Sequence, residues 1–389
     1  MKPPTATLMV IHHLRQGGAE RQLVELALGL ARRGERVTIA CIDQPGIELT
    51  GLREAGVRVL GLGAAGRLRR LLAVPRLARL ARRMDVVHCT MWDASLWGRL
   101  AAMLARRPVI VADHATDRSV QRSLAGARRD SWIALHNRLL DPFTYATVAC
   151  AKSQLPLLES EGVLRERIVL IPNGVPVAEL RRSARKGPTR EQLGIPDGAK
   201  VVVHVAHFRP EKNQAATLEL VAALREDLPD VHALFVGGGD RERVESEAKR
   251  IGAGWAHFLG RRSDVASLLA LSDLLVLPSR SDTMPMALLE SMALGVPFVA
   301  TDVGDVPWLV ARTGAGLCVP TGNTAALHDA CFRILADERL ARGLSEAATA
   351  GIYEFDANRM LDRYSMLFAA AADGLAPPGG GDAASEVAQ

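Results

Sequence analysis

The sequence of 389 residues predicts an α/β protein built from two tandem doubly wound domains. Short apolar runs alternate with longer amphipathic stretches along most of the chain, which is the pattern of parallel strands joined by helices. One polar segment rich in glycine and proline, Arg181–Lys200, interrupts this series near the middle. The length also favours two cores, because single cores stop growing at about 250–300 residues.

The first series predicts a strand over Thr5–Leu14, a helix over Ala19–Arg33 and a strand over Arg36–Ile42. Further strands are expected at residues 56–62, 85–89, 108–114 and 146–149, with helical segments between them. Parallel strands joined in this way form a sheet that helices cover on both faces. Residues 1–180 therefore predict an N-terminal Rossmann-like domain.

The second series begins after Arg181–Lys200, which we interpret as the interdomain linker and the entry to the second domain. Strands are expected at residues 200–207, 231–236, 257–259, 274–278, 296–300 and 316–319. Residues 181–350 thus predict a second Rossmann-like domain. Residues 351–372 predict a C-terminal helix that packs back on the first domain, and residues 373–389 predict a disordered tail.

Composition excludes several classes of protein. Hydrophobic residues make up 48% and charged residues 23%, as in soluble globular proteins. No apolar run approaches the roughly 20 residues of a membrane span, and the first residues predict no signal peptide. The cysteines are few and widely spaced, which indicates reduced, buried thiols and a cytoplasmic location instead of disulfides or a zinc site. They are Cys41, Cys89, Cys150, Cys318 and Cys331.

Charge is divided unequally along the chain. Residues 1–180 carry 26 lysines and arginines against 16 acidic residues, whereas the remaining residues carry 22 against 27. The basic half has few aromatic residues and no recognition-helix motif, so we expect no nucleic-acid partner. An anionic membrane surface or a phosphorylated acceptor fits this charge better.

The strongest basic segment is Gly66–Arg83, in which seven arginines lie among leucines. Arg99, Arg106 and Arg107 flank another apolar helix, and basic amphipathic surfaces bind anionic membranes. We therefore expect peripheral contact with the inner face of a membrane, and the alternative is an ordinary solvated helix. Pro75 is expected to break the helix of this segment.

Two loops that follow predicted strands carry candidate ligand-binding groups. Gln16–Glu20 (QGGAE) opens a helix, where paired glycines admit a ligand and free amides attract anions. It matches neither the G-x-G-x-x-G nor the Walker pattern, so NAD and ATP lose support. In His207–Asn213 (HFRPEKN), Arg209 and Lys212 are suited to clamp a diphosphate and neutralise a leaving group. A plain turn and a solvated loop are the respective alternatives.

The densest polar stretch is Pro278–Pro297, where a strand ends, a polar loop follows and a helix runs from about Pro285 to Leu294. Its acids, Asp282 and Glu290, are eight residues apart. Glu290 lies on an otherwise apolar helix, where a carboxylate needs a partner or a ligand. His88, on a strand of the first series, is a further candidate on the acceptor side.

These segments together resemble the family-4 retaining glycosyltransferases with the GT-B fold. The matching motifs extend over nearly the whole chain, and their order and spacing are more specific than any one of them. They are G-G-A-E at Gly17–Glu20, I-P-N-G-V at Ile171–Val175, R-P-E-K at Arg209–Lys212, G-G-G at Gly237–Gly239, F-L-G at Phe258–Gly260 and the P-x-A-L-L-E run ending at Glu290.

The resemblance implies two Rossmann-like domains with an interdomain cleft, the first on the acceptor side and the second binding the nucleotide sugar. It implies a hexosyltransferase of polysaccharide biosynthesis that retains the anomeric configuration. The donor is a nucleotide-diphosphate sugar, UDP- or GDP-linked, and the acceptor is a hydroxyl of a glycan or lipid-linked molecule. A covalent intermediate and same-face attack both remain open as mechanisms.

The resemblance also implies roles for residues. Arg209 and Lys212 hold the donor diphosphate, Glu290 contacts the ribose hydroxyls, and Asp282 takes the first acid position near the donor sugar. His114 hydrogen-bonds the donor sugar near the reacting carbon, so that His114 and Asp282 are the catalytic candidates.

The remaining contacts that the resemblance implies involve mainly backbone. Gly18 approaches the diphosphate from the first domain, whereas Gly260 and Arg261 lie near the nucleobase. Backbone amides across Thr283, Met284, Pro285, Met286 and Ala287 hold sugar hydroxyls and phosphate.

Three departures from the family pattern predict an altered sugar pocket. Asp282 replaces the usual glutamate, Thr283-Met284 replaces the common Gly-Phe, and Trp308 stands where a glutamate is common. A non-catalytic nucleotide-sugar-binding subunit and a nucleotide-sugar epimerase are the alternative functions. The chain has no Asp-x-Asp motif, and Arg209, Lys212 and helix amides can balance the diphosphate charge, so we expect no metal and no cofactor.

Overall fold

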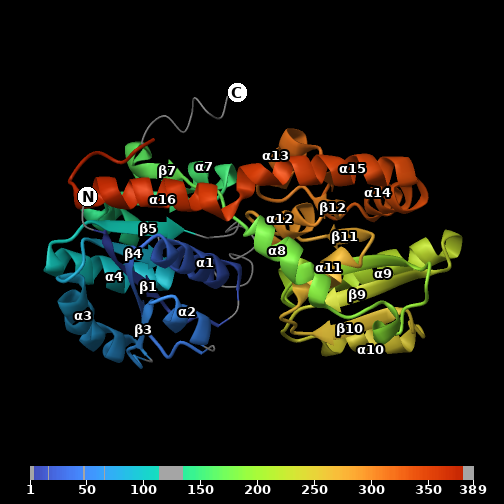
Figure 1. Cartoon of the computed structure of the whole chain (residues 1–389), viewed down its shortest axis with the longest axis horizontal. Coiled ribbons are helices and arrows are strands. Elements are labelled where there is room, and N and C mark those ends of the chain that lie inside the picture. The colour runs from blue at the N-terminus through green and yellow to red at the C-terminus, as the bar shows by residue number, and fades with distance from the viewer. Residues whose placement is uncertain (1–3, 16, 47–48, 65, 114–134, 380–389) are drawn as a thin grey trace. The chain divides into compact units, whose positions relative to one another are not determined.

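The computed structural model describes residues 4–15, 17–46, 49–64, 66–113 and 135–379, and the chain divides into two compact units. The first unit comprises residues 1–174 and 357–389, and the second comprises residues 175–356. Each unit holds one parallel sheet with helices around it (Figure 1), which confirms the predicted α/β class. Residue 181, the expected boundary, lies inside a helix, α8 (Val177–Ser183), that belongs wholly to the second unit.

The sheet of the first unit has the strand order β3-β2-β1-β4-β5-β6-β7, and all of its strand pairs are parallel. Its last strand was not among those that the sequence predicted, and β1 ends three residues earlier than the predicted strand. The strands are β1 (Ala6–Ile11), β2 (Arg36–Cys41), β3 (Arg58–Gly61), β4 (Val86–Thr90), β5 (Val109–Asp113), β6 (Ala146–Ala149) and β7 (Ile168–Leu170).

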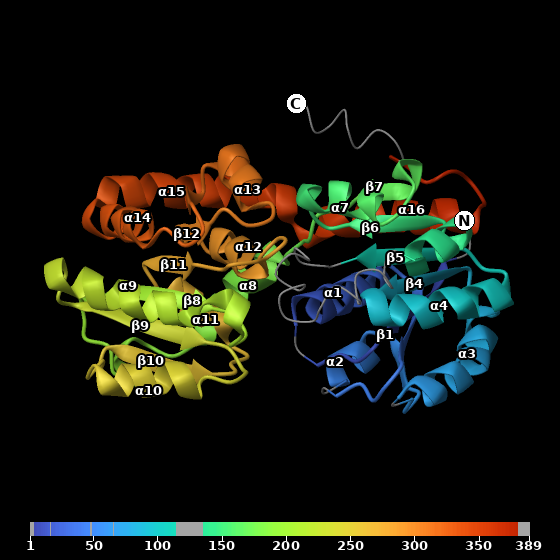
Figure 2. The ribbon, with the colours of Figure 1, turned by 180° about the vertical axis from the view of Figure 1, so that it is seen from behind.

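Helices cover both faces of this sheet, because successive side chains of a strand point to opposite faces. Met9 and Ile11 of β1 pack with one group of helices that includes α1 and α16, whereas Leu8 and Val10 pack with α3 and α4. The two views agree that α3 and α4 lie side by side (Figure 2). The helices are α1 (Gly18–Arg32), α2 (Thr50–Glu54), α3 (Arg67–Ala81), α4 (Trp92–Ala105), α7 (Leu155–Ser160) and α16 (Ala357–Ala372).

The chain returns to the first unit through α16, which packs along α1. Residues 352–355 form a separate 3-10 turn in the second unit, so the helix begins at Ala357, later than the sequence predicts. The chain leaves the first unit after Gly174 and returns to it at Ala357. A Cβ on Gly174 would lie 2.9 Å from Cα of Ala357. Gln22 holds Gly174 by two reciprocal hydrogen bonds of 2.9 and 3.1 Å. Of the expected tail, residues 380–389 lie outside the described residues.

Pro75 does not break α3, so that prediction is wrong. The helix runs continuously from Arg67 to Ala81 with Pro75 inside it. A proline removes the hydrogen bond to the carbonyl four residues earlier, which here is that of Leu71. Pro75 and Leu71 are both exposed, so water can solvate this carbonyl, while buried residues such as Val74 and Leu77 hold the opposite face on the sheet.

The second unit has a six-stranded parallel sheet in the order β10-β9-β8-β11-β12-β13. A cluster of buried side chains joins this sheet to α9, α10, α14 and α15, and α8, α11 and α12 pack on one another outside that cluster. The strands are β8 (Lys200–Val205), β9 (Val231–Val236), β10 (Ala256–Gly260), β11 (Leu274–Leu277), β12 (Phe298–Thr301) and β13 (Gly316–Val319). The other helices are α9 (Gln214–Asp227), α10 (Glu242–Arg250), α11 (Val265–Ala270), α12 (Met286–Ala293), α13 (Val306–Thr313), α14 (Thr324–Ala336) and α15 (Glu338–Gly351).

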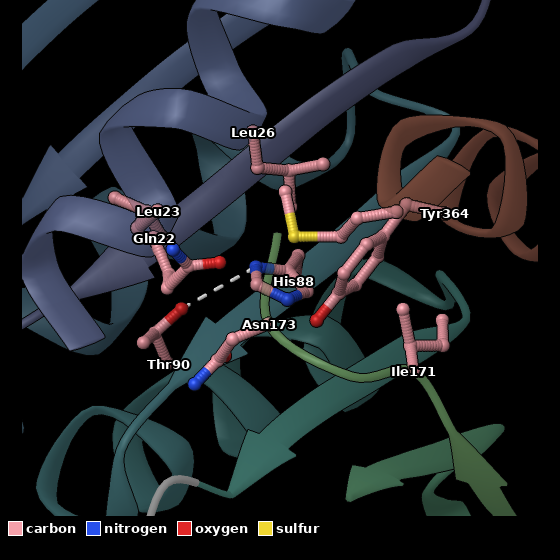
Figure 3. A pocket seen from close by; sticks show the side chains of 9 residues that line it. Gln22, Leu23, Leu26, His88, Thr90, Ile171, Asn173 and Tyr364 are labelled. Carbon is pink, nitrogen blue, oxygen red and sulfur yellow. Dashed lines mark hydrogen bonds between the residues drawn. The ribbon is translucent and has the colours of Figure 1, made fainter. Parts of the chain in front are cut away.

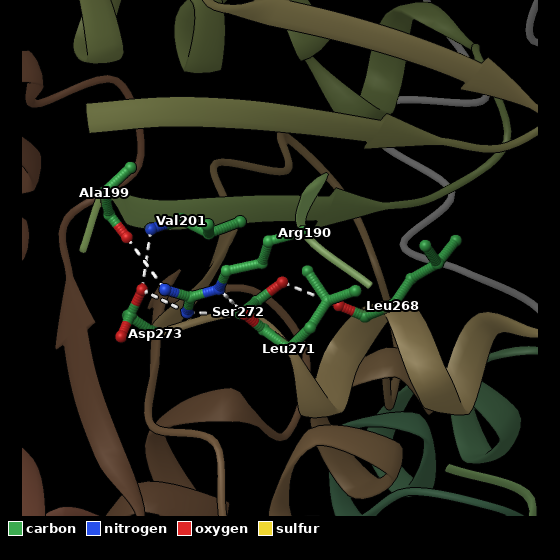
Figure 4. A network of polar contacts seen from close by, with 7 residues as sticks. All are labelled: Arg190, Ala199, Val201, Leu268, Leu271, Ser272 and Asp273. Carbon is green, nitrogen blue, oxygen red and sulfur yellow. Dashed lines mark hydrogen bonds and ion pairs between the residues drawn. The ribbon is translucent and has the colours of Figure 1, made fainter. Parts of the chain in front are cut away.

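The segment interpreted as the linker and the entry to the second domain lies wholly within the second unit, and Arg190 fixes it there (Figure 4). Its guanidinium donates to the carbonyl oxygens of Leu271 at 2.6 and 2.9 Å and of Ala199 at 2.9 Å. It also pairs with Asp273 at 2.9 Å, and the same carboxylate accepts from the backbone of Val201 at 2.7 Å. A polar sequence therefore carries a hydrogen-bond network that ties it to β8 and to the turn before β11.

Candidate functional site

Loops at the carboxyl ends of three neighbouring strands, β8, β11 and β12, are joined by hydrogen bonds in the second unit. The backbone N–H of Arg280, after β11, donates to the carbonyl of Glu211, after β8, at 2.7 Å. The backbone N–H of Asp305, after β12, donates to the carbonyl of Thr283 at 2.8 Å. Because ligands of parallel sheets bind at carboxyl ends, this joined edge is the candidate site.

The basic pair lies in the loop after β8. Pro210 opens a 3-10 turn, Pro210–Lys212, and Asn213 adopts a left-handed conformation with φ of 53°, which asparagine tolerates better than most residues. This turn leads directly into α9 and places Arg209 and Lys212 on the same loop. Arg209 is exposed and makes only a loose ion pair with Glu211 at 3.8 Å, whereas Lys212 is largely shielded, with 20% of its side chain exposed.

Lys212 and Asp282 form an ion pair, which joins two of the predicted site residues. One carboxylate oxygen, Oδ2 of Asp282, accepts from Nζ of Lys212. The other, Oδ1, accepts from the backbone N–H of Thr283 at 3.0 Å. Asp282 thus contacts a lysine that was predicted to hold the diphosphate and one of the backbone amides that were predicted to hold the donor.

The loop between β11 and α12 packs tightly against the loop after β12. A Cβ on Gly304, whose φ is 54°, would overlap the carbonyl oxygens of Asp282 and Thr283. Only glycine allows this approach without displacing the backbone that presents Asp282. Trp308, one of the departures from the family pattern, lies on α13 with its ring 5.8 Å from that of Phe355.

The other predicted residues of this stretch lie on α12 or just before it. Pro285 precedes the helix and has no amide hydrogen, so it cannot contribute the donor that was expected across Thr283–Ala287. Met284 is buried, and Met286 and Ala287 begin the helix. Glu290 is 2% exposed on the same helix, so this acid is buried within the second unit.

Two serines that the sequence analysis did not select also belong to this loop. Ser279 and Ser281 are buried, and within the described part of the chain neither hydroxyl has a hydrogen-bond partner. A buried hydroxyl without a partner is costly, so it is a candidate ligand contact. The sequence signal was available, since both serines stand in the polar run directly after β11.

Gly260, the last residue of β10, and Arg261 after it were expected near the nucleobase and lie at the same edge of the sheet. Gly260 has φ of 63°, and its carbonyl accepts from the backbone N–H of Gly237 at 2.8 Å. Arg261 is exposed, and His207 lies nearby. Burial, followed by the charges of Arg209 and Arg261, lowers the pKa of His207, so the ring is neutral at pH 7.

Of the residues predicted in the first unit, Gly18 is the first residue of α1 and His114 lies outside the described residues. The preceding Gly17 has extended backbone, and a Cβ there would overlap the carboxylate of Glu20. Glu20 also lies 3.7 Å from His13. Gly17 therefore leaves room for Glu20 at the helix N-terminus, where a carboxylate is favoured by the helix dipole.

His88 is not placed as an acceptor-side candidate requires. It lies within β4 at 1% exposure, and the rings of Tyr364 and Phe368 on α16 pack edge-on against it at 5.6 and 5.7 Å. His88 and Thr90 line a small cavity together with residues of α1 and α16 (Figure 3), and their side chains are 3.5 Å apart. His88 is thus part of the packing between the first sheet and α16.

The basic surface of the first unit is centred on α3, where Leu68, Leu71 and Leu72 are 72%, 54% and 67% exposed. Exposed arginines surround them along the same helix. Arg99, which the sequence placed with this surface, is instead 1% exposed and donates to Asn137 at 3.2 Å.

Among the helices of the described ranges, none has the length and apolar character to span a bilayer. Within those ranges no three histidine, cysteine or acidic residues gather as metal ligands.

Two parallel α/β sheets, with paired basic and acidic side chains at the strand ends of the second, agree with the fold of glycosyltransferases that use nucleotide-sugar donors. The model described as Glycosyltransferase Family 4 matches residues 16–179, and the model described as Glycosyl transferases group 1 matches residues 186–350. The chain therefore belongs to the family-4 glycosyltransferases.

Individual relatives agree with this assignment. The phosphatidyl-myo-inositol mannosyltransferase of Mycobacterium leprae is 26% identical over 87% of this chain and 89% of its own length. The N-acetyl-alpha-D-glucosaminyl L-malate synthase of Bacillus anthracis is 29% identical, over 46% of this chain and only 48% of its own length. The crystal structure of Anabaena HepE with UDP and glucose has a TM-score of 0.81 at 21% identity and covers 93% of this chain and 98% of that one. This last likeness concerns the fold.

Proposed function

We propose that this enzyme transfers a hexose, with retention of configuration, from a UDP- or GDP-linked sugar to a hydroxyl of a glycan or lipid-linked acceptor. The observation that carries the donor half is the joined edge of the second sheet, where Lys212, Asp282 and the Thr283 amide converge. Arg209 and Lys212 bind the diphosphate, and Glu290 holds the ribose. Asp282 faces the donor sugar.

Charge balance supports a metal-independent reaction. As the bond to the sugar breaks, negative charge grows on the diphosphate leaving group, and fixed cations that stabilise it lower the barrier. Arg209 and Lys212 supply two such charges on one loop. The buried hydroxyls of Ser279 and Ser281 offer further contacts to the donor, because they have no partner in the described part of the chain.

The direct test is binding of UDP- and GDP-sugars by calorimetry, with and without EDTA, followed by an assay of each bound donor for hydrolysis and transfer. We expect one donor class to bind equally well with EDTA and to be hydrolysed slowly without acceptor. Binding of none would refute the donor site, and loss of binding with EDTA would refute metal independence. Binding without turnover on any acceptor or water would favour a non-catalytic subunit.

For the acceptor side we propose that the enzyme works in the cytoplasm and docks on the inner face of an anionic membrane through α3. Exposed leucines cost free energy in water, and the arginines beside them are attracted to anionic lipid headgroups. Lipid-linked acceptors are found at such a surface. The name of one relative, phosphatidyl-myo-inositol mannosyltransferase, is in keeping with this proposal because it contains the name of a lipid.

Vesicle sedimentation tests the membrane proposal. We expect binding to phosphatidylcholine vesicles only when phosphatidylglycerol is included, and weaker binding at high salt. The triple variant Leu68→Ser/Leu71→Ser/Leu72→Ser should lose this binding, whereas the control Ile251→Ser, at an exposed position of the second unit, should keep it. Equal binding of the two variants would contradict docking through α3.

A further inference from the structure

We propose that Asp282 is an internal counterion that the donor must displace from Lys212, and that this exchange lets the site distinguish a nucleotide sugar from the nucleoside diphosphate left after transfer. The inference rests on the proposed function and adds a selectivity step to the same site. In this selectivity step Asp282 acts partly through its ion pair with Lys212.

The carboxylate of Asp282 occupies two groups that a donor anion needs. One oxygen accepts from the Lys212 ammonium and the other from the Thr283 amide, at 3.0 Å. Carboxylate and phosphate oxygens satisfy such donors in the same way. Without donor, Asp282 therefore takes the place of a phosphate.

The ion pair is shielded and held by its surroundings. Only 20% of the Lys212 side chain and 12% of the Asp282 side chain are exposed, so water and salt screen their attraction less than at an open surface. The backbone hydrogen bond between Arg280 and Glu211 joins the two loops that carry Lys212 and Asp282. Gly304 packs against the carbonyl of Asp282. A diphosphate that enters the site must therefore compete with the Asp282 carboxylate for the ammonium of Lys212.

Displacement has different consequences for donor and product. Once a diphosphate takes Lys212, the Asp282 carboxylate loses a charged partner in a poorly solvated site, which is costly unless new hydrogen-bond donors reach it. A nucleotide sugar brings sugar hydroxyls that can donate to this carboxylate. At its phosphate end, a nucleoside diphosphate brings only acceptor oxygens and added negative charge, so Asp282 opposes its binding and favours its release.

The test compares the wild type with Asp282→Asn, which keeps the size of the side chain and removes its charge. UDP and GDP, and the matching nucleotide sugars, are titrated by calorimetry. We expect Asp282→Asn to bind the nucleoside diphosphate about fivefold more tightly than the wild type, the scale of one partly exposed ion pair. Affinity for the nucleotide sugar should not rise, so the ratio of nucleotide-sugar affinity to nucleoside-diphosphate affinity should decrease.

Three controls fix the interpretation. Asp282→Glu retains the charge and should bind the nucleoside diphosphate within about twofold of the wild type, on the same scale of pair energies. Asp329→Asn makes the same charge change at a side chain that is 79% exposed on α14 and should change nothing. The nucleoside, which lacks phosphate, should bind all variants alike. If Asp282→Asn does not fold, Asp282→Ser carries the same expectation.

A substitution that damages the site would weaken binding of the nucleoside diphosphate. Tighter binding of it by Asp282→Asn therefore indicates that the Asp282 carboxylate competes with the diphosphate for Lys212. If the wild type binds the nucleoside diphosphate and the neutral variants bind it equally or more weakly, Asp282 does not compete for Lys212 and the inference is overturned. If the wild type binds neither nucleoside diphosphate nor nucleotide sugar, the proposed donor site fails, and the inference fails with it.

Discussion

Lys212 and Arg209 share a loop but are held in different ways. Lys212 is shielded and paired with Asp282, while Arg209 is exposed and only loosely paired with Glu211. An ammonium acts as a compact point charge, whereas a guanidinium forms planar, two-pronged contacts. We therefore assign the fixed charge beside the reacting phosphate to Lys212 and the outer contact with the diphosphate to Arg209.

Replacement of Lys212 by alanine tests this assignment. We expect Lys212→Ala to raise the barrier to transfer by about 2–4 kcal/mol, because growing charge on the leaving diphosphate loses its fixed partner. The measurement is kcat/KM for transfer or donor hydrolysis. The control is Lys249→Ala, which removes an exposed lysine on α10 of the same unit. Equal rates for the two variants would show that Lys212 does not act on the donor.

At this scale the sequence located residues but not their partners. Arg209, Lys212 and Asp282 were recognisable because each follows a strand in a polar motif. The Lys212–Asp282 pair was not foreseen, since its members are 70 residues apart and only the sheet order brings their loops together. Arg99 was misplaced for a related reason. It lies within the apolar helix α4 and does not flank it, and the sequence gives no sign that Asn137 accepts a hydrogen bond from its guanidinium.

Among the elements, α3 combines an exposed apolar face with an internal proline. Its buried residues, such as Val74 and Leu77, belong to the core cluster shared with α4, so packing maintains the helix across Pro75. Tertiary packing of this kind commonly overrides local propensity. The exposed leucines lie in the first turns, before the proline, so the proposed membrane docking would use a different face of the helix from the one that packs on the sheet.

Restoring the missing backbone hydrogen bond should stabilise α3. We expect Pro75→Ala to raise the free energy of unfolding by about 1–3 kcal/mol, because alanine donates to the Leu71 carbonyl and has the highest helix propensity. The greater flexibility of the unfolded alanine chain offsets part of this gain. Chemical denaturation checks the value. Arg76→Ala, an exposed neighbour on the same helix, is the control and should change stability little.

A decrease in stability on Pro75→Ala would mean instead that the proline ring fits a bend in the helix that the fold requires. In that case Arg76→Ala would still leave stability nearly unchanged, so the two results separate a local backbone effect from a general sensitivity of α3.

The sequence was informative about long elements and poor for short or polar ones. Strands with four or more apolar residues were found, but β7, Ile168–Leu170, is too short to stand out beside the following I-P-N-G-V motif. The segment Arg181–Lys200 has the composition of a linker, yet Arg190 binds it to the second unit. One arginine with several carbonyl partners fixes a polar segment, and composition does not reveal those partners.

At the scale of the two units, each contains a buried histidine that is kept neutral, His136 in the first and His204 in the second. Burial, and then the charge of Arg99, lowers the pKa of His136 in the first unit to about 4. Burial, and then the charge of Lys212, lowers the pKa of His204 in the second unit to about 3, and its Nδ1 lies 2.7 Å from the Thr217 hydroxyl. These pKa values are below the ordinary value of about 6.5, so the unfolded chain binds these protons first as the pH falls.

Stability should therefore be greatest above pH 6.5 and decrease as the pH falls from there toward 4, by on the order of 1 kcal/mol per pH unit for each histidine. Unfolding midpoints measured between about pH 7.5 and 4.5, where histidines of the unfolded chain take up protons and these two folded groups stay largely neutral, check this dependence. His204→Leu should reduce the slope, because the second unit then has no buried imidazole at this position to protonate. Phe235→Leu, at the ring stacked 6.2 Å from His204, should lower stability by a similar amount at every pH and leave the slope unchanged. Parallel curves for the wild type and His204→Leu would show that protonation of His204 does not cause the acid sensitivity.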